Sequence, residues 1–266
     1  MMLFKKGEIK DLEMEIDKKI KKFIKKFGKT REIKELTEIK KQDKLKDDFF
    51  DIIFKLSYTS DKKQRQQLIK KAKNLADKIP ELRGWPDDSK KFWDVEAYAW
   101  LGKIPKKVRT AIKQELLKKI PLGNLNISIG SGSYPYIEES VLLDFSREML
   151  KSVPPVKFKA RLEYDLEKGI LPFKNNSFDN AAMVFIIDYI KNLKPILKEV
   201  KRILKPKGKL ILVNTKKPIN KWYRKHEIRQ YSKKDIKKLL TEAGFKAKVE
   251  EKKIDNINLL IAEGVK

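Results

Sequence analysis

Two short segments of the chain carry residue types that could together bind a nucleoside. Gly130–Gly132 (Gly-Ser-Gly) follows an apolar run that ends at Ile129, and glycine lets the backbone turn sharply while a ligand approaches it closely. A second apolar run, Val141–Leu143, is followed directly by Asp144. In an open α/β sheet, a carboxylate at the end of the strand beside such a loop accepts hydrogen bonds from a ribose diol. The two segments therefore predict a nucleoside site at the carboxyl ends of adjacent strands.

The scarcity of two residue types excludes several other chemistries. The chain has no cysteine and a single histidine, His226. Disulfides, thiolate metal ligands, a cysteine nucleophile and a histidine-rich metal site are therefore excluded, and no metal is expected. If a base is needed, the candidates are His226 and the pair Asp188 and Tyr189, between which the sequence does not choose.

The elements that must position these residues begin after Pro121. From there, short apolar runs alternate with helical stretches, a pattern typical of repeated β-α units and a parallel sheet. The expected strands are Asn126–Ile129, Val141–Leu143, Ala181–Ile187, Leu210–Val213, Ala247–Glu250 and Asn258–Ala262. The expected helices are Arg147–Ser152, Leu193–Leu204 and Lys233–Ala243. Gly208 and Gly244 follow the last two helices, where a glycine C-cap is expected.

Upstream of the sheet, apolar residues recur at helical spacing. They predict amphipathic helices over Glu8–Phe27, Ile33–Leu56, a third segment that ends before Pro80, and Lys106–Ile120. The first three form either a small module of their own or a cover for one face of the downstream domain, and both alternatives stay open.

Aromatic residues gather in two places. Three of the four tryptophans lie between Trp85 and Trp100, where helical spacing is typical of a core and the alternative is a lid over a substrate pocket. Lys221–Lys225 (Lys-Trp-Tyr-Arg-Lys) mixes aromatic rings with cations, which suits stacking and phosphate contact. It suits a second part of the lid, over Pro218–Tyr231, equally well.

Four segments occur in a characteristic order: Gly130–Gly132; Leu143–Leu150 (Leu-Asp-Phe-Ser-Arg-Glu-Met-Leu); Asp165–Glu167 with Leu171–Asp179; and Glu199–Leu210. Together they resemble the class I S-adenosylmethionine-dependent methyltransferases of the type 11 methyltransferase domain group, and Tyr231–Phe245 resembles the late helix and turn of that family. The resemblance implies an α/β fold: a Rossmann-like, seven-stranded, mostly parallel sheet with helices on both faces, preceded here by an N-terminal helical extension. We accordingly expect a helical module over 1–82 and a methyltransferase domain over 83–266, with aromatic lid or entry helices in 83–120 and the cofactor core in 121–215.

The resemblance also implies S-adenosyl-L-methionine as the cofactor and suggests which residues bind it. Gly130, Ser131 and Gly132 would pass close to its methionine part. Asp144 would hold the ribose hydroxyls, and Phe145 would lie against the adenine.

Three more residues complete the implied cofactor site. Asp165 would accept a hydrogen bond from the adenine amino group, and the backbone N–H of Leu166 would reach the ring. Phe185 would lie near the sulfonium and the substrate.

The chain departs from the family pattern around the glycine loop. Ser128 stands where the family usually has an acidic residue, and Tyr134 replaces the third loop glycine. Only 14 positions separate Gly130 from Asp144, so the first helix is expected to be short and deformed by Pro135. These departures leave open a degenerate, non-catalytic member of the family.

Charge is distributed unevenly along the chain. The net charge is +27, made of +14 over residues 1–120, zero over 121–200 and +13 over 201–266. The motifs lie in the neutral third, so the basic flanks could bind RNA. Only 9 of the 64 basic residues are arginine, however, and a lysine excess is also typical of a plain solvated surface. No apolar run could span a bilayer and no signal peptide is evident, so we expect a cytoplasmic protein without a membrane partner.

Three functions remain open on the sequence. The first two are a methyltransferase that acts on a small molecule and one that acts on RNA through the basic flanks. The third is an RNA- or nucleic-acid-binding or scaffold protein with a degenerate, non-catalytic cofactor fold. No Asn/Asp-Pro-Pro-Tyr/Phe motif follows Ala181–Ile187, which excludes the familiar site of adenine-amino methylation. The absence of cysteine excludes methylation at pyrimidine C5 through a thiolate adduct.

Overall fold

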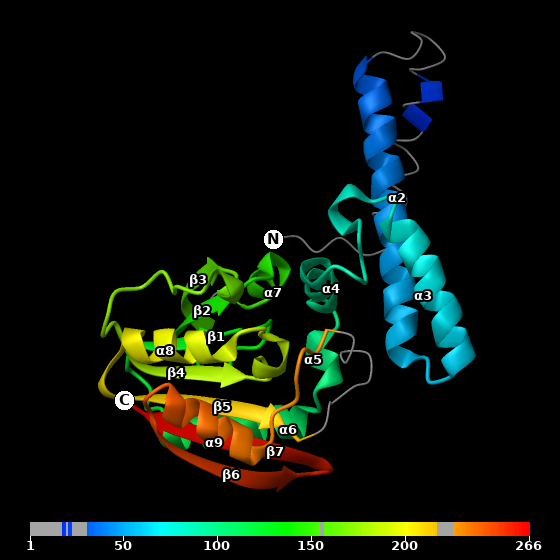
Figure 1. Cartoon of the computed structure of the whole chain (residues 1–266). Helices are drawn as coiled ribbons and strands as arrows, with labels where there is room; N and C mark the ends of the chain where they lie inside the picture. Colours follow the sequence, from blue (N-terminus) through cyan, green and yellow to red (C-terminus); the bar gives the residue numbers. More distant parts are fainter. Residues whose placement is uncertain (1–17, 20, 23–30, 155–156, 217–225) are drawn as a thin grey trace. The chain divides into compact units, whose positions relative to one another are not determined.

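The computed structural model describes residues 18–19, 21–22, 31–154, 157–216 and 226–266. The chain divides into two compact units, Met1–Trp85 and Pro86–Lys266 (Figure 1). Most of the helix expected over Glu8–Phe27 and all of Lys221–Lys225 lie outside the described residues. Whether residues 1–82 fold as an independent module stays a prediction.

The first unit contains two long helices that pack against each other. They are α2 (Arg31–Tyr58) and α3 (Lys62–Ala76), followed by the short 3-10 helix η1 (Pro80–Leu82). Asp61 caps α3 by accepting a hydrogen bond from the Gln64 N–H at 2.7 Å. Trp85 belongs to this core, because it is 1% exposed and its ring meets that of Phe49 edge-on with centroids 5.2 Å apart. Trp85 is therefore a core residue, as its helical spacing indicated, and is not part of the alternative lid.

The second unit begins with three helices and continues into a seven-stranded sheet. The helices are α4 (Ser89–Glu96), α5 (Trp100–Lys103) and α6 (Lys106–Lys119). The strands are β1 (Asn126–Ile129), β2 (Ser140–Asp144), β3 (Phe158–Glu163), β4 (Phe178–Val184), β5 (Leu204–Thr215), β6 (Lys246–Ile254) and β7 (Ile257–Val265). Their order is β3-β2-β1-β4-β5-β7-β6, with β1 to β5 parallel and β7 antiparallel to both of its neighbours. The predicted fold class is confirmed.

Helices cover both faces of this sheet (Figure 1). Leu210 and Leu212 of β5 belong to the core under α8 (Leu193–Ile203) and α9 (Lys233–Glu242). The alternate residues, Ile211 and Val213, face the core under α6. Because successive side chains of a strand point to opposite faces, a strand buried on both sides has few polar positions. This explains the continuous apolar runs in the sequence.

Three local predictions are wrong. The edge strand β3 was missed because its residues are mostly exposed and polar, which leaves no apolar run. No helix forms over residues 130–139 between β1 and β2, where a short one was expected. Gly208 lies inside β5 rather than at a C-cap, and a Cβ there would be 2.8 Å from the carbonyl oxygens of Asp179 and Lys205. The cap at Gly244 is confirmed by its φ of +88° and its N–H bond to Thr241 O.

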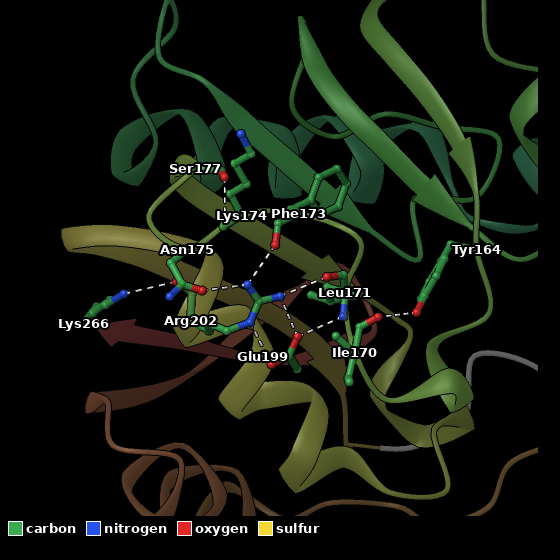
Figure 2. A network of polar contacts seen from close by, with 10 residues as sticks. All are labelled: Tyr164, Ile170, Leu171, Phe173, Lys174, Asn175, Ser177, Glu199, Arg202 and Lys266. Carbon is green, nitrogen blue, oxygen red and sulfur yellow. Dashed lines mark hydrogen bonds and ion pairs between the residues drawn. The ribbon is translucent and has the colours of Figure 1, made fainter.

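A polar network fixes the loop that leads into β4 (Figure 2). The guanidinium of Arg202 donates to the carbonyls of Leu171 at 2.9 Å and Phe173 at 2.8 Å, and it pairs with Glu199 at 2.7 Å. Glu199 also accepts the Leu171 N–H at 2.9 Å, and the Tyr164 hydroxyl donates to the neighbouring carbonyl of residue 170. The network therefore connects α8 to the carboxyl end of β3, where the site described next begins.

Candidate functional site

A cavity of about 890 Å³ lies at the carboxyl ends of β1 to β4. Its walls include all eight residues predicted for the cofactor: Gly130, Ser131, Gly132, Asp144, Phe145, Asp165, Leu166 and Phe185. Strand register explains why they meet, since Ile129 of β1 is level with Leu143 of β2 and Met183 of β4. Loops that follow level parallel strands emerge at one edge, where α/β sheets bind ligands.

The glycine bend requires glycine at Gly130. Its φ is +63°, and a Cβ there would lie 2.4 Å from Cγ1 of Ile186. Gly132 also has a positive φ, of +59°. The N–H groups of Gly130 and Ser131 donate to Leu143 O at 2.8 and 3.2 Å, so the end of β2 holds the bend in place.

Asp144 is held rigidly beside this bend. Its side-chain oxygens accept the N–H of Gly132 at 2.8 Å and of Ser146 at 2.9 Å, and only 7% of the residue is exposed. Burial raises the pKa of Asp144 to about 6 although both hydrogen bonds favour the ionised form. Each carboxylate oxygen retains capacity for a further donor.

Helix α4 is connected by polar contacts to this end of the cavity. Asp94 accepts a hydrogen bond from the Ser146 hydroxyl at 2.6 Å. Lys90, on the same helix, lies 3.5 Å from Asp94 and 3.2 Å from Glu163 at the end of β3. Lys90 and Glu163 both line the cavity.

The turn after β3 continues the wall. The N–H of Tyr164 donates to Asp144 O at 2.8 Å, which fixes this turn against β2. Asp165 caps the 3-10 helix η3 (Leu166–Lys168) by accepting the Glu167 N–H at 2.9 Å. Glu167 in turn accepts the Lys191 N–H at 2.8 Å.

Another part of the cavity wall is aromatic. The ring of Trp93 on α4 packs edge-on against the ring of Trp100 on α5, with centroids 5.5 Å apart and an interplanar angle of 78°. It packs in the same way against the ring of Tyr189, with centroids 5.1 Å apart and an angle of 83°. All three rings line the cavity, so this part of the predicted lid segment is found there. Phe185, which follows β4, has a φ of +58° and donates its N–H to Val213 O at 2.8 Å. A bulky side chain in this backbone conformation is a strained outlier of the kind that clusters at functional sites.

The three candidate bases occupy different places. Asp188 is buried and does not line the cavity. Its carboxylate accepts a hydrogen bond from Asn214 Nδ2 at 2.9 Å, and burial raises its pKa to about 7. Tyr189 lines the cavity, and burial raises its pKa above the ordinary value. His226 also lines it, with Nε2 3.0 Å from Pro86 O and its ring centroid 4.1 Å from that of Phe92.

Tyr136 is one of the residues of this site that the sequence did not suggest. It lines the cavity and is 5% exposed, and its hydroxyl has no hydrogen-bond partner among the residues that the structure describes. The available signal was the Tyr-Pro-Tyr stretch at 134–136, which stands where the family has a glycine and a helix.

Within the described ranges, no three or more His, Cys, Asp or Glu side chains come together in a way that could hold a metal ion. No helix among those residues is long and apolar enough to cross a membrane.

Comparisons with known proteins agree with this geometry. A family model described as "Methyltransferase domain" matches residues 125–212. The chain is 30% identical over 149 residues to protein MJ1123 of Methanocaldococcus jannaschii, a match that covers 50% of this chain and 69% of that protein. It is 35% identical over 102 residues to the demethylmenaquinone methyltransferase of Renibacterium salmoninarum, covering 35% of this chain and 41% of that enzyme.

Solved structures share the fold. A methyltransferase from Haloferax volcanii, determined in complex with the Trm112 methyltransferase activator, superimposes with a TM-score of 0.53 at 19% identity. That match covers 65% of this chain and 96% of the other. A SAM-dependent methyltransferase from Thermotoga maritima gives a TM-score of 0.51 at 20% identity and covers 66% and 97%.

Proposed function

Because this chain belongs to the class I S-adenosylmethionine-dependent methyltransferases, we propose that it transfers a methyl group to a small molecule bound in the described cavity. S-adenosyl-L-methionine is the cofactor of this family. The observation that carries the proposal is the position of Asp144, which lies beside the Gly130–Gly132 bend with both oxygens anchored by backbone N–H groups.

The residues around the cavity fit the cofactor in the order of its parts. Asp165 and Leu166, after β3, would bind the adenine, while Asp144 at the end of β2 and Phe145 after it would bind the ribose and adenine. The bend after β1 would hold the methionine part, and Phe185 after β4 would lie near the reacting methyl. The volume of about 890 Å³ is that of a site for a ligand of this size with an acceptor beside it.

The bound cofactor supplies a strongly electrophilic methyl group. The chain therefore mainly has to orient the acceptor in line with that methyl and to exclude water. Trp93, Trp100 and Tyr189 form the apolar wall that does both at the β4 end. Tyr189 and His226 both reach the cavity, but burial raises the pKa of Tyr189 and keeps its hydroxyl protonated, so His226 is the group through which an acceptor proton could leave.

The charge around the cavity favours a small acceptor over RNA. Six carboxylates line it (Asp88, Asp144, Glu163, Asp165, Glu167 and Glu227) against three lysines (Lys90, Lys168 and Lys191). A polyanion would be repelled at this wall in spite of the net charge of +27 on the whole chain. RNA methylation through the basic flanks remains the alternative, and a steep loss of RNA binding with added salt would support it.

Thermal melting with S-adenosylhomocysteine tests the proposal. At about 100 times its dissociation constant, the ligand should stabilise the fold by roughly 2.7 kcal/mol, a rise of about 5–10 °C in melting temperature. The substitution Asp144→Asn should remove most of this rise, because the variant binds the ligand only weakly. Asp255→Asn is the matched control, because Asp255 lies in the β6–β7 turn with a φ of +51° that asparagine tolerates.

The control and a turnover assay separate the remaining outcomes. Asp255→Asn should show the full rise in melting temperature. If the ligand does not change the melting temperature of the wild type, the proposed cofactor site is wrong. A normal rise without methyl transfer to any fraction of cell extract would instead identify a degenerate, non-catalytic member of the family.

A further inference from the structure

Three aromatic rings form one part of the cavity wall, and their arrangement suits a positive charge. The ring of Trp93 stands nearly perpendicular to the rings of Trp100 and Tyr189, and all three residues line the cavity. Trp93 is buried, whereas Trp100 and Tyr189 are half-buried and keep part of their surface for a ligand. The face of an aromatic ring is negative, so it attracts a cation that lies within about 6 Å of the ring centroid. These three rings are called the aromatic wall below.

The aromatic wall begins next to the glycine bend. A Cβ on Gly132 would lie 3.5 Å from Nε1 of Trp100, so this ring comes close to the bend. Tyr189 belongs to the 3-10 helix η4 (Ile187–Tyr189), which follows Phe185 and β4 along the chain. The proposed function places the methionine part of the cofactor at the bend and the reacting methyl near Phe185. The aromatic wall is therefore the part of the cavity in which the acceptor is expected.

The lysines that line the cavity lie close to carboxylates on its β3 side. Lys90 lies 3.2 Å from Glu163, at the end of β3. Lys168 belongs to η3, which follows β3. The N–H of Lys191 donates to Glu167, also of η3, at 2.8 Å. In the proposed binding mode this side of the cavity holds the adenine and not the acceptor.

Carboxylates lie near the aromatic wall. Asp88 caps α4 and lines the cavity. Glu227 lines it as well, and the pKa of Tyr189 is raised first by burial and then by the charge of Glu227. The smaller charge effects on this pKa, from Asp188 and Glu96, also come from carboxylates. The surroundings of Tyr189 therefore favour a positive charge.

The cofactor offsets only part of the negative charge of the cavity. Among the described residues, six carboxylates and three lysines line it. S-adenosyl-L-methionine carries a sulfonium and an ammonium group against a single carboxylate, so negative charge remains in excess when it is bound. A cleft lined by one sign of charge attracts ligands of the opposite sign, and a partly buried charge without compensation opposes folding and binding. A cationic acceptor supplies that compensation, whereas an anionic acceptor is repelled.

We infer that the acceptor is a small organic cation, such as an amine protonated at neutral pH, whose charged nitrogen lies against the aromatic wall near Glu227. This inference rests on the proposed function and specifies the class of its acceptor. A neutral acceptor could also pack against the rings, but it would leave the excess of carboxylates uncompensated.

The test compares two probes of the same shape and different charge. Choline carries a quaternary ammonium group, and 3,3-dimethyl-1-butanol has carbon in place of that nitrogen. Dissociation constants for both are measured by NMR titration of the full chain with S-adenosylhomocysteine bound. Tyr189→Leu and Trp100→Leu each remove one half-buried ring of the aromatic wall, whereas Tyr189→Phe keeps the ring. Tyr98→Leu is the control, because Tyr98 is 64% exposed and does not line the cavity.

The wild type should bind choline at least about tenfold more tightly than the uncharged alcohol. Each leucine variant should weaken choline by about 3- to 30-fold, as for the loss of one cation–π contact, and change the affinity for the alcohol by less than about twofold. Tyr189→Phe and Tyr98→Leu should bind both probes like the wild type. Choline that binds no more tightly than the alcohol, or does not bind, would overturn the inference and leave the proposed function intact. Equal weakening of both probes by the leucine variants would also overturn it, because the rings would then act by packing alone.

The sulfonium of the cofactor is the other cation that could lie against these rings. Calorimetric titrations of the wild type and of Tyr189→Leu with S-adenosylmethionine and with S-adenosylhomocysteine separate the two cases. The inference expects the ratio of the two affinities to differ by less than about twofold between these proteins. A loss confined to S-adenosylmethionine, with choline binding retained, would assign the aromatic wall to the sulfonium and overturn the inference. Failure of the wild type to bind S-adenosylhomocysteine would instead overturn the proposed function.

Discussion

The ionisation of Asp144 makes cofactor affinity depend on pH. Its pKa of about 6 means that roughly nine in ten molecules carry the carboxylate at pH 7, but only about one in ten at pH 5. Ribose hydroxyls donate more strongly to the carboxylate than to the protonated acid. The affinity for S-adenosylhomocysteine should therefore fall about tenfold between pH 7 and pH 5, which is about 1.4 kcal/mol.

The same protonation has the opposite effect on the free protein. Because burial raises the pKa of Asp144 above its ordinary value, the ionised form destabilises the fold above pH 6. Lowering the pH through 6 relieves this cost, so a weaker affinity at pH 5 cannot be attributed to Asp144 destabilising the fold.

Calorimetric titrations at pH 7, 6 and 5 measure the effect directly. The ligand's own carboxyl and amino groups titrate outside this range. Asp144→Asn should bind weakly with no pH dependence, whereas Asp255→Asn should follow the wild type. An affinity for the wild type that stays constant within twofold from pH 7 to pH 5 would refute the role given to Asp144.

Two further substitutions test the framework around the site. Arg202→Ala should lower the free energy of unfolding, measured in urea, by about 1–3 kcal/mol, because the carbonyls of Leu171 and Phe173 lose their donor. Arg202→Lys should recover only part of this loss, since lysine lacks the several N–H donors of a guanidinium. An unchanged urea midpoint for Arg202→Ala would show that the network in Figure 2 does not stabilise the fold. Gly130→Ala should lower the free energy of unfolding by about 2–4 kcal/mol, because its φ is positive and the new Cβ would lie 2.4 Å from Cγ1 of Ile186. Gly123→Ala should lower it by only about 1–2 kcal/mol, because its φ is +87° but no atom lies within 4 Å of the new Cβ. Equal losses at the two glycines would contradict the close packing at the bend.

Local sequence patterns predicted those parts of the fold that are buried from both sides. The strand around Leu210–Val213 is continuous in apolar residues because both faces are covered, so its position could be predicted. Strand β3 could not be found this way, because an exposed edge strand has no need of apolar side chains. Gly208 was misassigned because a glycine after a helix and a glycine packed against a carbonyl look alike in sequence.

The candidate site likewise contains residues that local sequence patterns predict and residues that they do not. Gly130 and Asp144 were predicted because each stands at the end of an apolar run that forms a strand, and such ends meet at one edge of a parallel sheet. Asp165 comes after the strand β3 that was not predicted, so only the family resemblance indicated it. The contact of Trp93 with Tyr189 joins residues almost a hundred positions apart, and no local periodicity encodes it. His226 reaches the cavity by the same kind of long-range packing.

The departures from the family pattern have a common physical consequence. With Tyr134 and Pro135 in place of a third glycine and a helical turn, the β1–β2 connection loses the backbone N–H groups that a helix start would direct at an anion. The same change places two tyrosine rings in the core on the α6 side of the sheet, where the guanidinium of Arg109 lies over the Tyr134 ring and the Tyr134 ring meets that of Tyr136 edge-on. Packing of these rings, and not a helix start, therefore holds the loop that follows the glycine bend.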